Sequence, residues 1–182
     1  MRTLDEIWLV VLLLLLTSCS TQSDKSATPV DSLAPCSSIK TISSISDGML
    51  LECLDNDDEI SIKSIAGPAV ISVWASWCTN CAAQRKNFIK LHDEAGDLLQ
   101  VIGVDVEERS KSIGYNHALE NGLAFPQLYD PDGRSTTYFG PGVPITQFIN
   151  KEGVLTFQKV GPIFTYEEMQ ELVKEYLEID IG

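Results

Sequence analysis

The sequence predicts an α/β fold in which helices flank both sides of a mixed central sheet, with a β extension before the first central strand. Short apolar and β-branched runs alternate with helical stretches from residue 36 to residue 182. Their order is strand, helix, strand, then a helix, then two strands and a last helix. Two adjacent parallel strands need a crossover connection, usually a helix, whereas two antiparallel strands can be joined by a short hairpin. This order therefore indicates a sheet with both parallel and antiparallel pairs.

A strand–helix–strand unit opens the central part of the domain. Ala69–Trp74 is an apolar, β-branched run typical of a buried strand, and Val101–Val106 is a second one. Between them, Cys81–Ala95 has helical character. Gly96 suits the position just after the last helical turn, where a left-handed backbone is common.

The second half of the domain is predicted to hold a helix and a hairpin. Arg109–Glu120 suits a helix that ends at Asn121-Gly122. Ile145–Asn150 and Val154–Val160 are two strand-like runs on either side of Lys151-Glu152-Gly153. A short loop with glycine between two such runs is a hairpin signal.

The last helix is expected to open at Thr165 and to run to about Glu178. Glu168 lies three residues after Thr165, which is the spacing of a capping box. The apolar positions fall on one helical face, which is therefore expected to pack on the sheet. These positions are Met169, Leu172, Val173 and Tyr176.

Two cysteines, Cys36 and Cys53, precede the first central strand. Residues 37–43 and 49–54 are expected to form a hairpin across Ser46-Asp47-Gly48, which would bring the two thiols together. In an oxidising compartment a structural disulfide follows, and it would contribute about 3 kcal/mol by closing a loop of about 17 residues. Two unpaired buried thiols, or a second redox pair that relays electrons to Cys78, remain alternatives.

The N-terminal segment has the pattern of an exported lipoprotein. Ile7–Leu16 is an apolar run that would cover roughly 15 Å as a helix, half of a hydrocarbon core of about 30 Å, so residues 1–18 are interpreted as a signal peptide. Leu16-Thr17-Ser18-Cys19 resembles a bacterial lipobox, which implies a lipid on Cys19. An ordinary secretory signal is the alternative. Residues 19–35, rich in Ser and Thr, are expected to form a flexible tether.

The charge of the chain excludes one class of partner. The formal net charge is −13, and the 13 Lys and Arg residues are scattered along the sequence. Binding to a nucleic-acid backbone needs clustered cations, so nucleic acid is not expected as a partner. Membrane attachment would depend on acyl chains, because no basic patch is available to bind acidic lipids.

The segment Trp74-Ala75-Ser76-Trp77-Cys78-Thr79-Asn80-Cys81 carries the chemistry. A Cys-x-x-Cys at a strand-to-helix junction places its first thiol over the free N–H groups of the helix, which stabilise a thiolate. Cys78 is therefore the expected nucleophile, and Cys81, expected to be more buried, would resolve the mixed disulfide. A static disulfide or half of a zinc site is the alternative, although His92 and His117 are isolated in the sequence.

The chain resembles the thioredoxin superfamily, and within it the membrane-tethered TlpA/ResA-like proteins of bacteria. The resemblance covers nearly all of residues 36–182 and implies a thioredoxin-like fold and thiol–disulfide oxidoreductase activity, with no cofactor and no metal. The matching motifs are Gly67-Pro68, the segment from Trp74 to Cys81, Val104-Asp105, Tyr129-Asp130-Pro131-Asp132-Gly133 and Gly142-Val143-Pro144-Ile145-Thr146.

The resemblance also implies a substrate-binding element. The proline that matches Pro144 is cis in the family and faces the two cysteines, and the backbone beside it, at Val143, pairs with substrate as an added strand. Trp77, next to the first cysteine, is assigned to substrate binding as well. A proline that only starts a strand is the alternative for Pro144.

The sequence departs from the family pattern around the cysteines. Thr79-Asn80 contains no proline, so both backbone N–H groups are present to hydrogen-bond a thiolate, which favours the reduced form. Ser72 and Gln84 are neutral where many relatives carry a carboxyl group, so the deprotonation of Cys81 needs water or a carboxylate that the sequence does not place. Two cations on the following helix are expected to face solvent: Arg85 and Lys86.

The resulting hypothesis is an extracytoplasmic, membrane-anchored and monomeric thiol–disulfide oxidoreductase. The usual task of the family is to keep cysteines of exported proteins reduced, such as those of apocytochrome c or of metal-site proteins. Its partners would be such thiols and disulfides together with a membrane or extracytoplasmic redox protein. A disulfide oxidase or isomerase, a peroxidase, and a non-catalytic binding module or copper carrier are the alternatives.

Overall fold

The computed structural model describes residues 28–42 and 48–182. The expected signal peptide, the lipid-bearing Cys19, residues 20–27 of the tether and Ser46-Asp47 of the expected hairpin turn lie outside the described residues. Within the described ranges, no helix is both long enough and apolar enough to cross a membrane.

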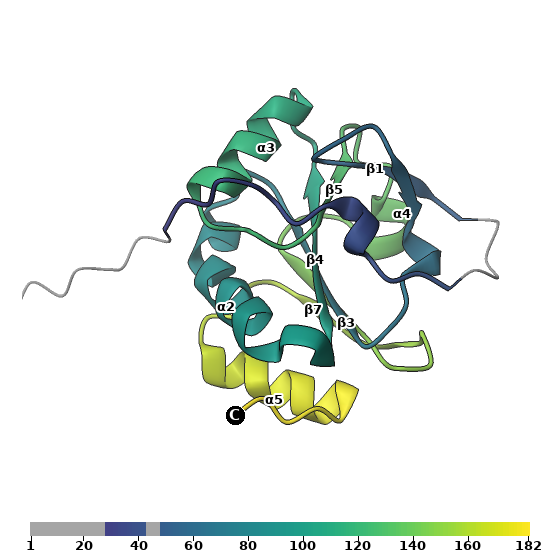
Figure 1. Ribbon diagram of the computed structural model, residues 1–182, viewed down its shortest axis with the longest axis vertical. Coiled ribbons are helices and arrows are strands. Elements are labelled where there is room, and N and C mark those ends of the chain that lie inside the picture. Colours follow the sequence, from purple (N-terminus) through teal and green to yellow (C-terminus); the bar gives the residue numbers. More distant parts are fainter. Residues whose placement is uncertain (1–27, 43–47) are drawn as a thin grey trace, which may run out of the picture.

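One mixed sheet organises the described chain, with its strands in the order β2-β1-β5-β4-β3-β6-β7 (Figure 1). The three central strands β3, β4 and β5 run parallel, and the flanking strands pair antiparallel. The strands are β1 (Leu50–Cys53), β2 (Glu59–Ser61), β3 (Ala69–Trp74), β4 (Gln100–Val106), β5 (Gln127–Asp130), β6 (Ile145–Ile149) and β7 (Leu155–Val160).

Helices cover both faces of this sheet, as the sequence predicted (Figure 1). The α-helices are α2 (Thr79–Ala95), α3 (Lys111–Glu120), α4 (Thr136–Phe139) and α5 (Tyr166–Leu177). Short 3-10 helices span Cys36–Ser38, Ile62–Ser64 and Gly96–Leu98. The two crossovers through α2 and α3 keep the same hand, so both helices lie on one face together with α5, while α4 lies on the other.

The core explains why the central strands form. Every residue of β3, β5 and β6 is buried, as expected for strands that are covered on both faces. The predicted strand Ala69–Trp74 is confirmed at both ends, and the predicted hairpin is the antiparallel pair β6–β7. At the C-terminal helix, Thr165 accepts a hydrogen bond from the Glu168 N–H at 3.1 Å, which confirms the capping box.

In the second half of the domain, two short elements have no counterpart in the sequence prediction. β5 and α4 are four residues each, and they follow one another along the chain. Four residues are too few to establish a period of 2 or 3.6, so these elements depend on the contacts that the rest of the fold provides. β5 completes the parallel part of the sheet beside β4.

The expected hairpin between residues 37–43 and 49–54 is wrong for the described residues. β1 pairs instead with β2 and with β5. β1 is followed directly by a turn that leads into β2. In this turn the Asn56 side chain accepts the Asp58 N–H at 2.7 Å, and the Asp58 carbonyl accepts the Cys53 N–H at 2.7 Å. Cys36 lies in a 3-10 helix, and Thr41 forms only an isolated bridge with Ile65.

Residues 28–35, which the sequence assigns to the tether, lie on the domain. The Val30 N–H donates to the Leu119 carbonyl at 2.9 Å, and the Ala34 N–H donates to the Ala124 carbonyl at 2.6 Å. Leu33 is buried in the core. Figure 1 shows this segment crossing between the helical face and β1. The folded unit therefore begins before residue 36.

Candidate functional site

The two motifs singled out in the sequence lie at the same end of neighbouring strands. β3 leads through Ala75–Trp77 into Cys78 and α2, and Val143-Pro144 leads into β6. β3 and β6 pair antiparallel with Val73 opposite Ile145, so the end of one strand meets the start of the other. The Val143–Pro144 peptide bond is cis, and so is Gly67–Pro68.

Cys78 and Cys81 are joined in a disulfide, with their Cα atoms 5.2 Å apart. Cys78 is the N-cap residue of α2, and its Sγ accepts the Cys81 N–H at 3.1 Å. A sulfur at this position faces the positive end of the helix, which favours a thiolate when the bond is reduced. In this disulfide-bonded form each cysteine is 7% exposed, so the expected deeper burial of Cys81 is not seen.

Exposed apolar side chains surround this end of the sheet. Trp77 is 57% exposed beside Cys78, and Val160 is 70% exposed opposite Ile145. Phe164, also exposed, lies in the loop that α2 holds: the Gln84 side chain accepts the Ile163 N–H at 3.0 Å. Exposed apolar groups gathered in one place are typical of surfaces that contact other proteins.

Gln84 thus has a structural task in this chain. Its side chain is buried and anchors the loop between β7 and α5. The neighbouring Asn87 reinforces the anchor by donating from Nδ2 to the Ile163 carbonyl at 2.8 Å. The neutral amide therefore fits its surroundings, and no proton-transfer role is needed to explain it.

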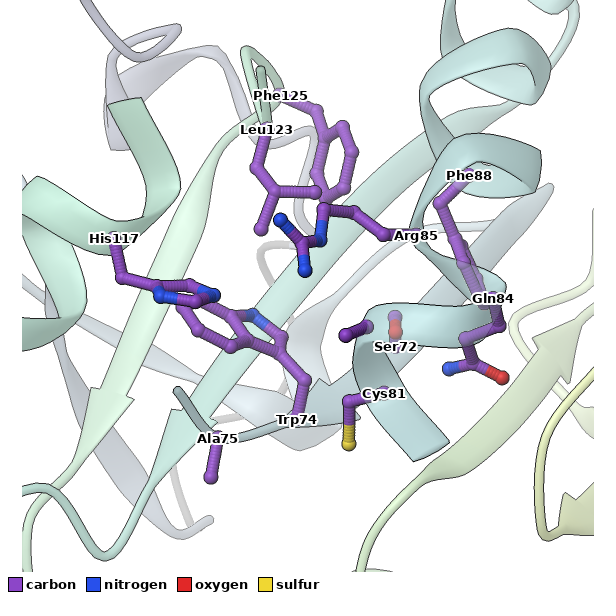
Figure 2. A pocket seen from close by; sticks show the side chains of 11 residues that line it. Ser72, Trp74, Ala75, Cys81, Gln84, Arg85, Phe88, His117, Leu123 and Phe125 are labelled. Atoms are coloured by element: carbon purple, nitrogen blue, oxygen red, sulfur yellow. The ribbon is translucent and has the colours of Figure 1, made fainter. Parts of the chain in front are cut away.

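A small pocket lies behind the disulfide, and Figure 2 shows its lining. Cys81 and Arg85, one helical turn apart on α2, both line it. The Arg85 side chain is half-buried and extends toward Trp74 and His117, so the expectation that it faces solvent is wrong. Burial lowers the pKa of Arg85 from its ordinary value. The remaining lining is mostly apolar and includes Phe88, Leu123 and Phe125.

His117, isolated in the sequence, belongs to this pocket. Its ring stacks on the Trp74 indole, with ring centroids 5.5 Å apart. Burial lowers the pKa of His117, and Arg85 lowers it further, while Glu108 and Glu120 act in the opposite direction. The neutral imidazole is thus favoured beside the indole.

A buried carboxyl group lies one strand away from the cysteines. Asp105 on β4 pairs in register with Trp74 on β3 and is 0% exposed. Among the described residues, neither of its carboxyl oxygens has a hydrogen-bond partner. Burial, and then the nearby Glu108, raises the pKa of Asp105 to about 8. A Cβ added to Gly114 of α3 would lie 1.7 Å from Oδ2, so the carboxyl group fills the space that this glycine leaves.

Glu108 connects this acidic region to the active-site loop. Its side chain is buried, and Oε1 accepts the Ser76 N–H at 2.6 Å, two residues before Cys78. The Tyr129 hydroxyl donates to the Glu108 carbonyl at 3.4 Å. Sequence analysis did not assign Asp105 or Glu108 to the site. Asp105 stood only in the family motif Val104-Asp105, and Glu108 was one of two acidic residues just after a buried strand.

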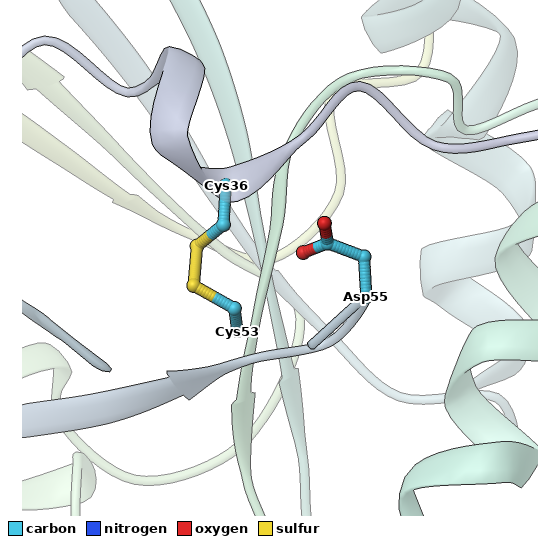
Figure 3. A group of neighbouring side chains, drawn as sticks. All are labelled: Cys36, Cys53 and Asp55. Atoms are coloured by element: carbon cyan, nitrogen blue, oxygen red, sulfur yellow. A yellow bond between two sulfur atoms is a disulfide. The ribbon is translucent and has the colours of Figure 1, made fainter. Parts of the chain in front are cut away.

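Cys36 and Cys53 are joined in a second disulfide, and both residues are 0% exposed. It links the first 3-10 helix to β1, with the two Cα atoms 5.8 Å apart. The Asp55 carboxylate points toward it, and the three donor atoms lie within 4.8 Å of one another (Figure 3). Because the two sulfurs are bonded to each other, they are not thiolate ligands for a metal in this state.

Comparison with known proteins places this arrangement in a family. A sequence model of the AhpC/TSA family matches residues 49–158, which include β1 to β7 up to Gln158 and both cysteines of the motif. The chain belongs to the AhpC/TSA family.

Curated relatives of this AhpC/TSA protein carry oxidoreductase names. It is 32% identical over 111 residues to the thiol:disulfide interchange protein DsbE of Yersinia pestis, covering 60% of this chain and 57% of that protein. It is 25% identical over 130 residues to the sporulation thiol-disulfide oxidoreductase A of Bacillus subtilis, covering 69% and 78%. These names agree with the expectation of an oxidoreductase. The chain spans less than two thirds of the Yersinia protein.

Solved structures confirm the thioredoxin-like fold. A DsbF homologue from Corynebacterium diphtheriae superposes with a TM-score of 0.62 at 22% identity, over 85% of this chain and 96% of that one. The pneumococcal exposed lipoprotein thioredoxin from Streptococcus pneumoniae superposes with a TM-score of 0.56 at 26% identity, over 71% and 99%.

Proposed function

We propose that this protein is an extracytoplasmic thiol–disulfide oxidoreductase in which Cys78 is the nucleophile and Cys81 the resolving thiol. The observation that carries the proposal is the position of the Cys78 sulfur. It caps α2, accepts a hydrogen bond from the Cys81 N–H and is bonded to the Cys81 sulfur. A thiol in this position has a lowered pKa, and a second thiol within bonding distance can complete the exchange.

The proposed reaction transfers two electrons to a substrate disulfide. In the reduced protein, the Cys78 thiolate attacks one substrate sulfur, and the other substrate sulfur leaves as a thiolate that takes up a proton. Cys81 then loses its proton and attacks the Cys78 Sγ, which releases the first substrate sulfur as a thiol. The product is the Cys78–Cys81 disulfide that the structure contains. A dithiol redox partner must reduce it before the next cycle.

Substrate is proposed to bind across Val143 and Trp77. The backbone of Val143 enters β6 beside the cysteine loop, where an extended segment can pair with it as an added strand. Trp77 offers an exposed aromatic face next to Cys78. The carbonyl of Pro144 accepts the Gly161 N–H at 2.9 Å, which holds this segment against β7.

The proposed direction is reduction of exported proteins, in the manner of the TlpA/ResA-like branch. Apocytochrome c and metal-site proteins are the proposed substrate types, and the DsbE relatives support an interchange role. Equilibration of the protein in thiol–disulfide buffers measures the midpoint of the Cys78–Cys81 couple. A strongly oxidising midpoint would replace the reductase proposal with the oxidase or isomerase alternative.

The proposed membrane anchor is a lipid on Cys19 after removal of residues 1–18, and residues 36–182 are the proposed thioredoxin-like domain. Because residues 28–35 lie on that domain, residues 19–27 remain as the proposed tether. The pneumococcal relative, a lipoprotein by its name, supports the proposal. Incorporation of labelled palmitate into the wild-type chain, and its loss in Cys19→Ala, is the expected result. Equal labelling of both would contradict it.

The Cys36–Cys53 disulfide is proposed to be structural. Both residues are fully buried, so an external thiol cannot reach the sulfurs in the folded chain. The pair also ties the first 3-10 helix to β1, which lies next to the edge strand β2 and is separated from β3 by β5 and β4.

A trapping experiment tests the catalytic proposal. Cys81→Ala removes the resolving thiol, so reaction with a disulfide-bonded protein substrate should stop at a mixed disulfide on Cys78. The product should be visible as a larger band that disappears on reduction. The matched control is the double variant Cys78→Ala, Cys81→Ala, which should form no such band. Equal trapping by the double variant would refute the assignment of Cys78 as the nucleophile.

A further inference from the structure

A shallow groove lies on the α4 side of the sheet, beside the cysteine loop. It is separate from the pocket of Figure 2, which lies on the α2 side. The groove has room for about one water molecule, near 20 Å³, so it cannot enclose a small-molecule ligand. We refer to it as the Glu107 groove; its lining includes Trp77, Glu107, Thr136, Phe139 and Val143.

Glu107 has an unusual backbone conformation. Its φ is +57°, in the left-handed region that non-glycine residues seldom occupy. This conformation is strained for a residue with a side chain. The Glu107 N–H donates to the Asp130 carbonyl at 2.9 Å, which holds the turn in place. Glu107 is exposed and lines the groove beside Trp77.

The carboxylate is also held by the shape of its surroundings. A Cβ added to Gly133 would lie 2.8 Å from Oε1 of Glu107, so the carboxylate occupies space that the glycine leaves open. Glu107 is the one charged side chain in the lining of the groove. In the described part of the chain, none of the ion pairs involves Glu107. It therefore has charge available for a partner.

Trp77 and Glu107 together present the chemistry that recognises a cation. An exposed indole face attracts an ammonium or guanidinium group, and a carboxylate pairs with the same group. The buried carboxyl group of Glu108 and the formal net charge of −13 repel an acidic segment as well. An apolar partner alone would leave the Glu107 carboxylate without a counterpart.

We propose that the Glu107 groove selects substrate segments that carry a Lys or Arg two residues before or after the reactive cysteine. An extended segment that pairs with the backbone of Val143 advances about 3.3 Å per residue, so a side chain two positions from the cysteine lies on the same face and near the groove. The inference rests on the proposed function, because it names the substrate class of the same site.

Three peptides of equal length test the proposal. Each has one cysteine, blocked as a mixed disulfide with 2-mercaptoethanol, and they differ only in Lys, Gln or Glu at the positions two residues before and two residues after the cysteine. The reduced full-length protein in detergent micelles should release the thiol of the Lys peptide about two- to five-fold faster than that of the Gln peptide. The Glu peptide should be slowest, and 1 M salt should bring the three rates together, because the screening length falls to about 3 Å.

Variants separate the charge from the backbone. Glu107→Gln should bring the Lys-to-Gln rate ratio close to one, and Glu107→Gly should do the same while relieving the positive φ. Glu171→Gln on the exposed face of α5 is the matched control and should keep the wild-type ratio. An unchanged ratio in Glu107→Gln, or equal rates for all three peptides with the wild type, would overturn this inference and leave the proposed function standing. Failure of the wild type to reduce any peptide would instead overturn the proposed function.

Discussion

Replacing Asp105 by Asn should stabilise the oxidised protein at neutral pH. The pKa of this carboxyl group is about 8 in the folded chain and 3.8 in the reference state. The folded protein therefore holds a proton there at pH 7 that the unfolded chain releases, and this mismatch makes folding less favourable as pH rises from about 4 to about 8. Each pH unit in this window corresponds to about 1.4 kcal/mol, so the cost reaches up to about 4 kcal/mol at pH 7.

The Asn side chain keeps the shape of the protonated acid and cannot ionise. Asp105→Asn should thus have the same free energy of unfolding as the wild type near pH 4, and exceed it increasingly up to about pH 8. Above that pH the difference should be constant, because Asp105 is then ionised in both states.

Urea unfolding at a series of pH values from 4.5 to 8.5, with both disulfides intact, measures this difference. Asp97→Asn, at an exposed position just after α2, is the matched control and should follow the wild-type curve. A difference between Asp105→Asn and the wild type that does not grow with pH would refute the reasoning. So would a variant that is less stable than the wild type at pH 8.

Two further substitutions test the packing. The double variant Cys36→Ala, Cys53→Ala should lose about 3 kcal/mol of unfolding free energy in urea, because the loop between these two residues is no longer closed in the unfolded chain. A loss of disulfide-exchange activity under conditions where the variant is folded would contradict a purely structural role. Gly114→Ala should be destabilised by about 1–3 kcal/mol, since its Cβ would lie 1.7 Å from the Asp105 carboxyl group, and the loss should be smaller in an Asp105→Ala background, where that carboxyl group is absent. Additive losses without any coupling between these two positions would contradict the contact.

The sequence predicted the elements whose signals are local. The β3 strand is a run of six buried residues, and the capping box at Thr165 lies within four residues, so short-range patterns were sufficient. The partner of β1 could not be predicted in the same way, because two turns competed for it and the choice depended on side-chain contacts at Asn56. The strand-to-helix junction at Cys78 was predicted because an apolar run and two closely spaced cysteines mark it directly.

Apart from Val143-Pro144, which the family resemblance supplied, the site was predicted only where residues are close in sequence. The motif from Trp74 to Cys81 was found, whereas Asp105, Glu108 and His117 come from other elements and meet it only through the sheet and α3. Register decides this: Asp105 lies beside Trp74 because β3 and β4 are aligned in parallel, and a shift of one residue would turn its side chain to the α4 face. A single sequence without its strand pairing contains no signal for that alignment.

The neutral side chains of Ser72 and Gln84 are best understood together with the charged side chains that surround the disulfide. Arg85 follows Cys81 by one turn and lines the same pocket. Asp105 holds a proton at neutral pH one strand away. On the opposite side, Glu107 lies where substrate is proposed to bind. A positive charge thus lies on the α2 side of the cysteine loop, and a negative charge lies on the α4 side, where substrate is proposed to bind.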